Sequence, residues 1–176
     1  MCIRDSHKGQ VYETGVITAP NLAQAMPSGA EEIEMRNDTH WTPRHAYVRL
    51  PEDYPGQAAD AAAIARLMVA EGVSYSFASY AALAAWRWGV RTPRLEKWMG
   101  RTRPARPAAG THDPAALGLP RTVRLPVEAI CSVFADQAWS LAGKRVMEGV
   151  PHQVVTPGAM AGQLLSREGV QWAWPR

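Results

Sequence analysis

Three stretches of helical periodicity, each closed by a glycine, most constrain what this chain can fold into. They run from Gln57 to Gly72, from about Ser79 to Gly89, and from Ile130 to Gly143. Apolar residues at intervals of three and four form one face of a helix, and glycine readily takes the left-handed conformation that ends one. We therefore expect three helices, each with a face to bury.

Two shorter segments also predict helices. The first covers residues 93–99. In the second, Thr156 and Pro157 are typical of an N-cap and first helical position, and Met160 and Leu164 follow at helical spacing.

Alternation of polar and apolar residues predicts strands near both ends of the chain. The expected strands are Gln10–Glu13, Glu31–Met35, Ala46–Leu50 and Val170–Trp174. Residues 15–27 are expected to form a long loop, and the Pro-, Arg- and Gly-rich residues 100–124 an exposed loop. Strands at both ends with helices between them predict an α+β fold, an antiparallel sheet with packed helices.

Composition and charge narrow the classes of function. The 176 residues, 47% of them hydrophobic, suit a single domain. A net charge of only +3 argues against nucleic acid as a partner, because a dedicated binder carries a dense basic stripe. Two cysteines and five scattered histidines predict no disulfide framework, metal or other cofactor. No apolar run of about 18 residues is present, so we expect no transmembrane segment and a cytoplasmic or virion-associated location.

The first six residues, Met1 to Ser6, resemble a translated sequencing adaptor. We therefore exclude residues 1–6 from the predicted domain, assign residues 7–176 to one domain, and expect the natural N-terminus to be missing. Cys2 then carries no functional information.

Cys131 is the first candidate for chemistry because it lies at the start of a predicted helix. A thiol in the first helical turn lies near unpaired backbone N–H groups and the positive end of the helix dipole. Both favour the thiolate, the nucleophilic form of a group whose unperturbed pKa is about 8.5. An inert cysteine buried for packing is the alternative.

Five segments, in order, resemble the circularly permuted papain-like families related to the NlpC-type cell-wall peptidases (YiiX/LRAT-like proteins). ICSVFADQAW at residues 130–139 is similar to their nucleophile helix, and VVTPGAMA at 154–161 to the segment that closes such domains. YSFASY at 75–80 resembles the aromatic stretch after their first long helix. QVYE at 10–13 and AMPSGA at 25–30 are similar to the two halves of a strand-and-turn motif.

The resemblance implies a permuted papain-like fold, with Cys131 as nucleophile and a catalytic histidine on an earlier strand. That histidine would lie just before the first predicted strand, where this chain has its adaptor-like head, and His7 lies too close to the turn. His45, at the start of a later strand, is the substitute candidate, with a surface histidine as the alternative. Glu13, or Gln24 in its place, would orient the imidazole and face the start of the cysteine helix.

The implied activity is hydrolysis of an amide or ester carbonyl through Cys131, as in a peptidase or amidase, without a cofactor. The implied substrates are peptides, peptidoglycan or acyl chains. The alternative is a non-catalytic structural or binding module, for example in a virion, that keeps the fold. Because a thiol without a positioned base also lacks its general acid, the missing histidine predicts little or no turnover by this chain.

Other polar and aromatic residues receive no functional role. His40, His112 and His152 lie in predicted loops. Tyr80 and Trp86 are expected to be core or rim residues, because aromatics at helical spacing are usually packing residues.

Overall fold

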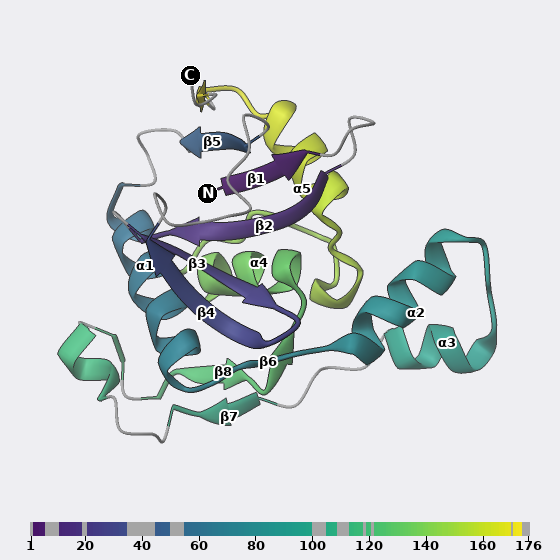
Figure 1. Ribbon diagram of the computed structural model, residues 1–176, viewed down its shortest axis with the longest axis horizontal. Helices are drawn as coiled ribbons and strands as arrows, with labels where there is room; N and C mark the ends of the chain where they lie inside the picture. Colours follow the sequence, from purple (N-terminus) through teal and green to yellow (C-terminus); the bar gives the residue numbers. More distant parts are fainter. Residues whose placement is uncertain are drawn as a thin grey trace.

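The computed structural model is a mixed α+β fold built on one six-stranded antiparallel sheet (Figure 1). It describes residues 2–5, 11–18, 21–34, 45–49, 55–99, 105–108, 113–117, 119–120, 122–169 and 171–173. The strand order is β10-β5-β1-β2-β3-β4. These strands are β1 (Cys2–Asp5), β2 (Val11–Ile17), β3 (Asn21–Met26), β4 (Gly29–Glu34), β5 (His45–Arg49) and β10 (Gln171–Ala173). The predicted α+β class and antiparallel sheet are confirmed.

The helices lie in two groups. The α-helices are α1 (Pro55–Ala70), α2 (Phe77–Arg87), α3 (Pro93–Met99), α4 (Cys131–Leu141) and α5 (Pro157–Leu165). Helices α1, α4 and α5 pack against the sheet, whereas α2 and α3 stand to one side of it (Figure 1). Among the helices described, none is both long and apolar enough to cross a membrane.

The hydrophobic core lies between the sheet and helices α1, α4 and α5. Ala23 and Ala25 of β3 face this core. Their neighbours Leu22 and Gln24 are also buried, and because successive side chains of a strand alternate, they lie on the other face of β3. The largest fully buried side chains of the helices are Phe134, Ile64, Leu67, Met68, Met160 and Leu164.

The helix ends follow the sequence signals. Gly72, Gly89 and Gly143 follow α1, α2 and α4, and all three have positive φ angles. The Thr156 side chain accepts a hydrogen bond from the N–H of Ala159 at 3.0 Å, so it caps α5 as predicted. These local signals succeeded because each acts within one turn of its own helix.

The prediction of a loop over residues 15–27 is wrong. Strand β2 continues to Ile17, and β3 returns beside it as the second strand of a hairpin. Alternation is hidden in β3 because residues 22–25 are all buried, on both faces of the sheet. A strand buried on both faces shows no period of two in its polarity.

Residues 100–124 are not simply an exposed loop. They include strand β7 (Ala105–Pro107), which pairs with β8 (Arg124–Pro126), and a 3₁₀ turn, η2 (Pro114–Leu117). Leu119 and Val123 are buried in the core. A short strand that pairs with a distant segment leaves no periodic pattern in the sequence. The Pro and Gly residues of this region therefore indicated only turns and loops.

Residues 1–6 were excluded from the predicted domain, yet Cys2–Asp5 form β1 inside the sheet. Strand β1 pairs with β2 on one side and with β5 on the other. It joins β10 and β5 to the β2–β3–β4 meander, and backbone hydrogen bonds can form along both of its edges. Backbone pairing depends little on side-chain identity, which is why an adaptor-like sequence can occupy this position.

Gly15 provides a direct test of the β2–β3 packing. A Cβ at this position would lie 2.9 Å from the Ala23 carbonyl oxygen and 2.9 Å from Leu22 Cδ1. We predict that Gly15→Ala lowers the free energy of unfolding by about 1–3 kcal/mol in urea titrations, because these neighbours must shift. Gly162→Ala, on the exposed side of α5, is the matched control, because a Cβ there would have no neighbour within 4 Å. It should raise the free energy of unfolding by about 0.5–1 kcal/mol. Equal stability of the Gly15 variant and the parent would contradict the packing.

Candidate functional site

Two short parallel strands bring the starts of α2 and α4 together. Strand β6 (Ser74–Tyr75) pairs with β9 (Glu128–Ala129), and each is followed, after one residue, by a helix. The N–H of Ser76 donates to the carbonyl oxygen of Ala129 at 3.1 Å, which carries the pairing up to the helix starts. Two helix N-termini, with their unpaired N–H groups and positive dipole ends, therefore lie side by side.

The two helix starts are capped differently. At α2, the Ser76 hydroxyl accepts a hydrogen bond from the N–H of Ser79 at 3.2 Å. At α4, the N-cap residue is Ile130, whose extended backbone (φ −92°, ψ 166°) is accompanied by no side-chain cap. Because Ile130 offers no oxygen, its side chain does not compete for the first-turn N–H groups of α4.

The prediction that Cys131 lies at a helix start is confirmed. It is the first residue of α4, a reduced cysteine whose exposed fraction is only 7%. Phe134 and Ala138 are buried along the helix as expected, whereas Leu141, the last residue of α4, is 37% exposed. The middle of the helix is therefore buried most fully, and the cysteine lies at its slightly more exposed first residue.

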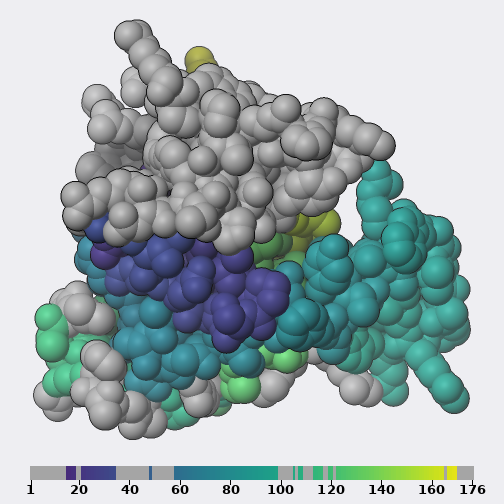
Figure 2. All heavy atoms as spheres, in the orientation of Figure 1, coloured from purple at the N-terminus to yellow at the C-terminus, as the bar shows by residue number. Residues whose placement is uncertain are grey.

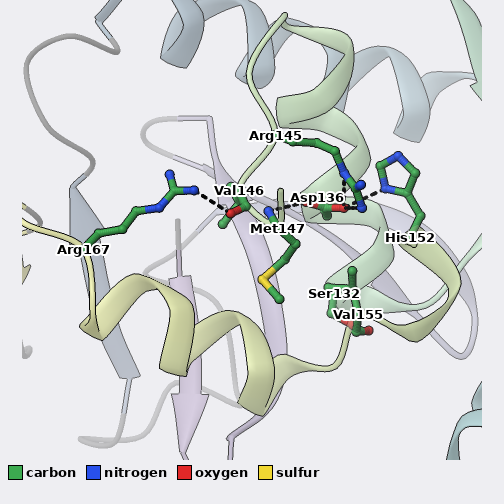
Figure 3. Close-up of polar contacts among 8 residues, drawn as sticks. All are labelled: Ser132, Asp136, Arg145, Val146, Met147, His152, Val155 and Arg167. Carbon is green, nitrogen blue, oxygen red and sulfur yellow. Dashed lines mark hydrogen bonds and ion pairs between the residues drawn. The ribbon is translucent and has the colours of Figure 1, made fainter. Parts of the chain in front are cut away.

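A polar cluster lies on one flank of α4 (Figure 3). Asp136 Oδ2 accepts hydrogen bonds from Arg145 Nε at 3.0 Å and Nη2 at 2.7 Å, and lies 2.6 Å from His152 Nδ1. Asp136 Oδ1 accepts from the N–H of Met147 at 3.0 Å. One turn earlier, the Ser132 hydroxyl donates to the Val155 carbonyl oxygen at 2.7 Å. These contacts fasten the segment after α4 to the helix.

Asp136 is a fully buried carboxylate with both oxygens engaged. Burial raises its pKa, but hydrogen bonds from His152, Arg145 and the Met147 N–H, with the positive charge of Arg145, lower the pKa below its ordinary value of 3.8. The hydrogen bonds outweigh the desolvation because charge-assisted bonds are strong where water is excluded.

Sequence reasoning missed this cluster because it assigned His152 to a loop without a role. His152 begins a 3₁₀ turn, η3 (His152–Val154), which packs against α4. The available signal was Asp136 itself, the one charged residue of α4, since a buried carboxylate requires donors. The Ser132 hydroxyl on the same flank is engaged by backbone, so the cluster supports the fold and provides no activated nucleophile. In the described part of the chain, no group of three or more His, Cys, Asp or Glu could hold a metal ion.

The predicted partners of Cys131 are placed only by their backbone. Glu13 lies in β2 and His45 in β5, and both pair with Arg4 of the intervening β1. They therefore occupy one row across three adjacent strands. Their side chains lie outside the described residues.

Gln24 does not face the start of α4 as expected. It lies on the face of β3 opposite the helical core, and its Nε2 donates to Glu31 Oε1 at 3.2 Å. Alternation forces this position, because Ala23 and Ala25 on either side of it pack toward the helices. His7, His40 and His112 lie outside the described residues.

Replacing Asp136 by asparagine tests the polar cluster. Asp136→Asn removes the carboxylate from Arg145 and His152 and should lower the free energy of unfolding by about 3 kcal/mol at neutral pH. Because the native pKa is lowered, the wild-type contribution is fully present above the ordinary pKa of 3.8 and is lost as pH falls through the lower native value. Denaturant titrations should therefore show a constant difference near neutral pH that shrinks only in acid. Asp60→Asn, on the exposed side of α1, is the control and should change stability by less than about 0.5 kcal/mol.

Comparison of the chain with protein-family models, curated proteins and solved structures finds no match. The permuted papain-like assignment therefore stays a proposal.

Proposed function

We propose that this chain is a permuted papain-like thiol hydrolase that attacks an amide or ester carbonyl through Cys131. The observation that carries the proposal is the position of Cys131 as first residue of α4, behind an N-cap residue with no side-chain acceptor. The neighbouring start of α2 adds a second positive helix end. The similarity of residues 130–139 to nucleophile helices supports the same assignment.

In the proposed reaction, the Cys131 thiolate forms a bond to the carbonyl carbon while an electron pair moves to the carbonyl oxygen. Backbone N–H groups in the first turn of α4 stabilise that oxyanion. The C–N or C–O bond then breaks, and the amine or alcohol leaves with a proton from the general acid. Water attacks the thioester, gives its proton to the base, and releases the carboxylic acid and the thiolate.

His45 is the proposed acid–base residue and Glu13 the residue that orients it. Their backbone positions share one row of the sheet, which supports the pairing of these two residues with each other. Gln24 is not retained in the role, because its side chain lies on the opposite face from the helical core. Peptides, peptidoglycan and acyl chains are the proposed substrate classes.

A second candidate is a non-catalytic structural or binding module that keeps this fold. The burial of Cys131 favours it, since a nearly buried thiol is also what a packing cysteine looks like. The two candidates differ in whether Cys131 is reactive, and both tests below address that point.

Alkylation of Cys131 across pH measures its thiolate fraction in the folded protein. We expect the rate of modification by iodoacetamide to rise with pH, with its midpoint below about pH 8.5, because a helix N-terminus favours the thiolate. The Cys2→Ser variant leaves Cys131 as the sole thiol. Adding Cys131→Ser to that variant removes both thiols and measures the background modification. A midpoint at or above that value, or no modification until the protein unfolds, supports the non-catalytic module.

Turnover assays decide between the candidates. With thioester, ester and peptide substrates, we expect Cys131→Ala to lower any measured kcat/KM by at least about a thousandfold, because a nucleophile cannot be bypassed. His45→Ala should lower it strongly if His45 is the base, whereas Ser140→Ala, near the other end of α4, should leave it unchanged. Turnover that persists without Cys131 refutes the proposal. Absence of turnover favours the module only if the alkylation test also finds Cys131 unactivated, because the missing histidine by itself predicts little or no turnover.

A further inference from the structure

The large apolar side chains most exposed to solvent in the described part of the chain gather on α2 and its C-cap residue. Trp88 is 83% exposed, Phe77 61% and Tyr80 58%. Together with the small Ala81 and Ala84, they follow the intervals of three, four, seven and eleven that define one face of a helix. The expectation that Tyr80 is a packing residue is therefore wrong, because α2 turns its aromatic stripe to solvent.

The opposite side of α2 faces the protein. Ser79 is buried, and Leu83 packs against the hydrophobic core. Aromatic side chains are thus exposed to solvent although the opposite side of α2 already packs on the protein. A contiguous exposed aromatic surface of this kind usually marks a site of association.

The segment that carries the aromatic stripe is also basic. Residues 77–99 contain four basic side chains, Arg87, Arg91, Arg94 and Lys97, and all four are exposed. Glu96 is the one acidic residue in that range, so the α2–α3 hairpin carries a net charge of +3. The whole chain also has a net charge of +3, and the remaining residues therefore balance to zero.

The turn between α2 and α3 is braced. The Arg91 guanidinium stacks on the ring of Trp86 at 3.7 Å and donates to the carbonyl oxygens of Trp86 and Val90. This contact uses Arg91 to hold the hairpin together. Arg87, Arg94 and Lys97 are the basic side chains available to a partner.

The hairpin also has a suitable shape for a broad partner. Helices α2 and α3 project from the body of the molecule (Figure 1), and the space-filling view shows them as a separate protrusion (Figure 2). A convex protrusion can meet a flat surface without obstruction from the rest of the protein.

We propose that the α2–α3 hairpin docks this protein onto an anionic lipid surface. Aromatic side chains favour the boundary between headgroups and acyl chains, and a helix with an aromatic face and flanking cations lies in that boundary. Phe77, Tyr80 and Trp88 enter the interface, while the free basic side chains contact lipid phosphates.

Single-stranded nucleic acid is less well suited to this surface. Such ligands occupy a positively charged groove in which bases stack on aromatic side chains along the strand. Here the aromatics lie on a convex helix, and the charge is modest. The lipid proposal depends on α2 and α3 alone, and so it is independent of the reactivity of Cys131.

Cosedimentation of the full chain with vesicles tests the proposal. We expect binding to vesicles of equal parts phosphatidylcholine and phosphatidylglycerol, weak binding to phosphatidylcholine alone, and release by high salt. The double variant Tyr80→Ser, Trp88→Ser should bind the anionic vesicles about tenfold less tightly or worse, because the apolar contact is lost. Arg94→Gln with Lys97→Gln should weaken binding by about fivefold for each charge removed.

Matched variants separate docking from folding. Leu141→Ser removes an exposed apolar side chain, and Arg124→Gln an exposed charge, both outside the hairpin, so both should bind as the parent does. If the aromatic variant misfolds by circular dichroism, the charge variant decides the question. Equal binding to neutral and anionic vesicles, no binding to either, or binding that survives the hairpin variants would overturn the proposal. A single-stranded oligonucleotide that binds more tightly than the vesicles, through the same hairpin residues, would also overturn it.

Discussion

The burial of α4 is the constraint on which the rest of the structure depends. Eight of its eleven residues are buried, so the helix is covered on nearly every side by the sheet, α1, α5 and the segment after α4. In a helix at that position, a buried polar group without a hydrogen-bond partner costs free energy. Ser132 and Asp136 therefore determine how the chain returns across the helix, through Val155, Arg145, Met147 and His152.

The junction of β6 and β9 connects this buried helix to the surface. Because the two strands are parallel, Phe77 and Cys131 are the first residues of adjacent helices. The exposed aromatic stripe begins at one of these residues, and the candidate nucleophile is the other. The proposed lipid-docking surface and the proposed nucleophile thus begin at the same structural unit.

Much of the fold and part of the site could be predicted from the sequence. Thr156 capped α5, glycines closed α1, α2 and α4, and Cys131 opened α4, because each signal acts through the nearest backbone groups. The hairpin of β2 and β3 was missed because burial on both faces removed the alternation. The Asp136 cluster was missed because the spacing of Arg145 and His152 in the sequence does not indicate that they contact the same carboxylate.

The sequence by itself determined where helices begin and end, the apolar face of α4 and the helical position of the thiol. These features depend on residues within one or two turns of each other, where backbone geometry allows few alternatives. Only the tertiary structure decided that β1 joins the sheet, that Gln24 faces away from the helices, and that α2 exposes its aromatic residues. Each of those outcomes depends on which segment packs against which face, and a periodic pattern specifies that a face exists without specifying what covers it.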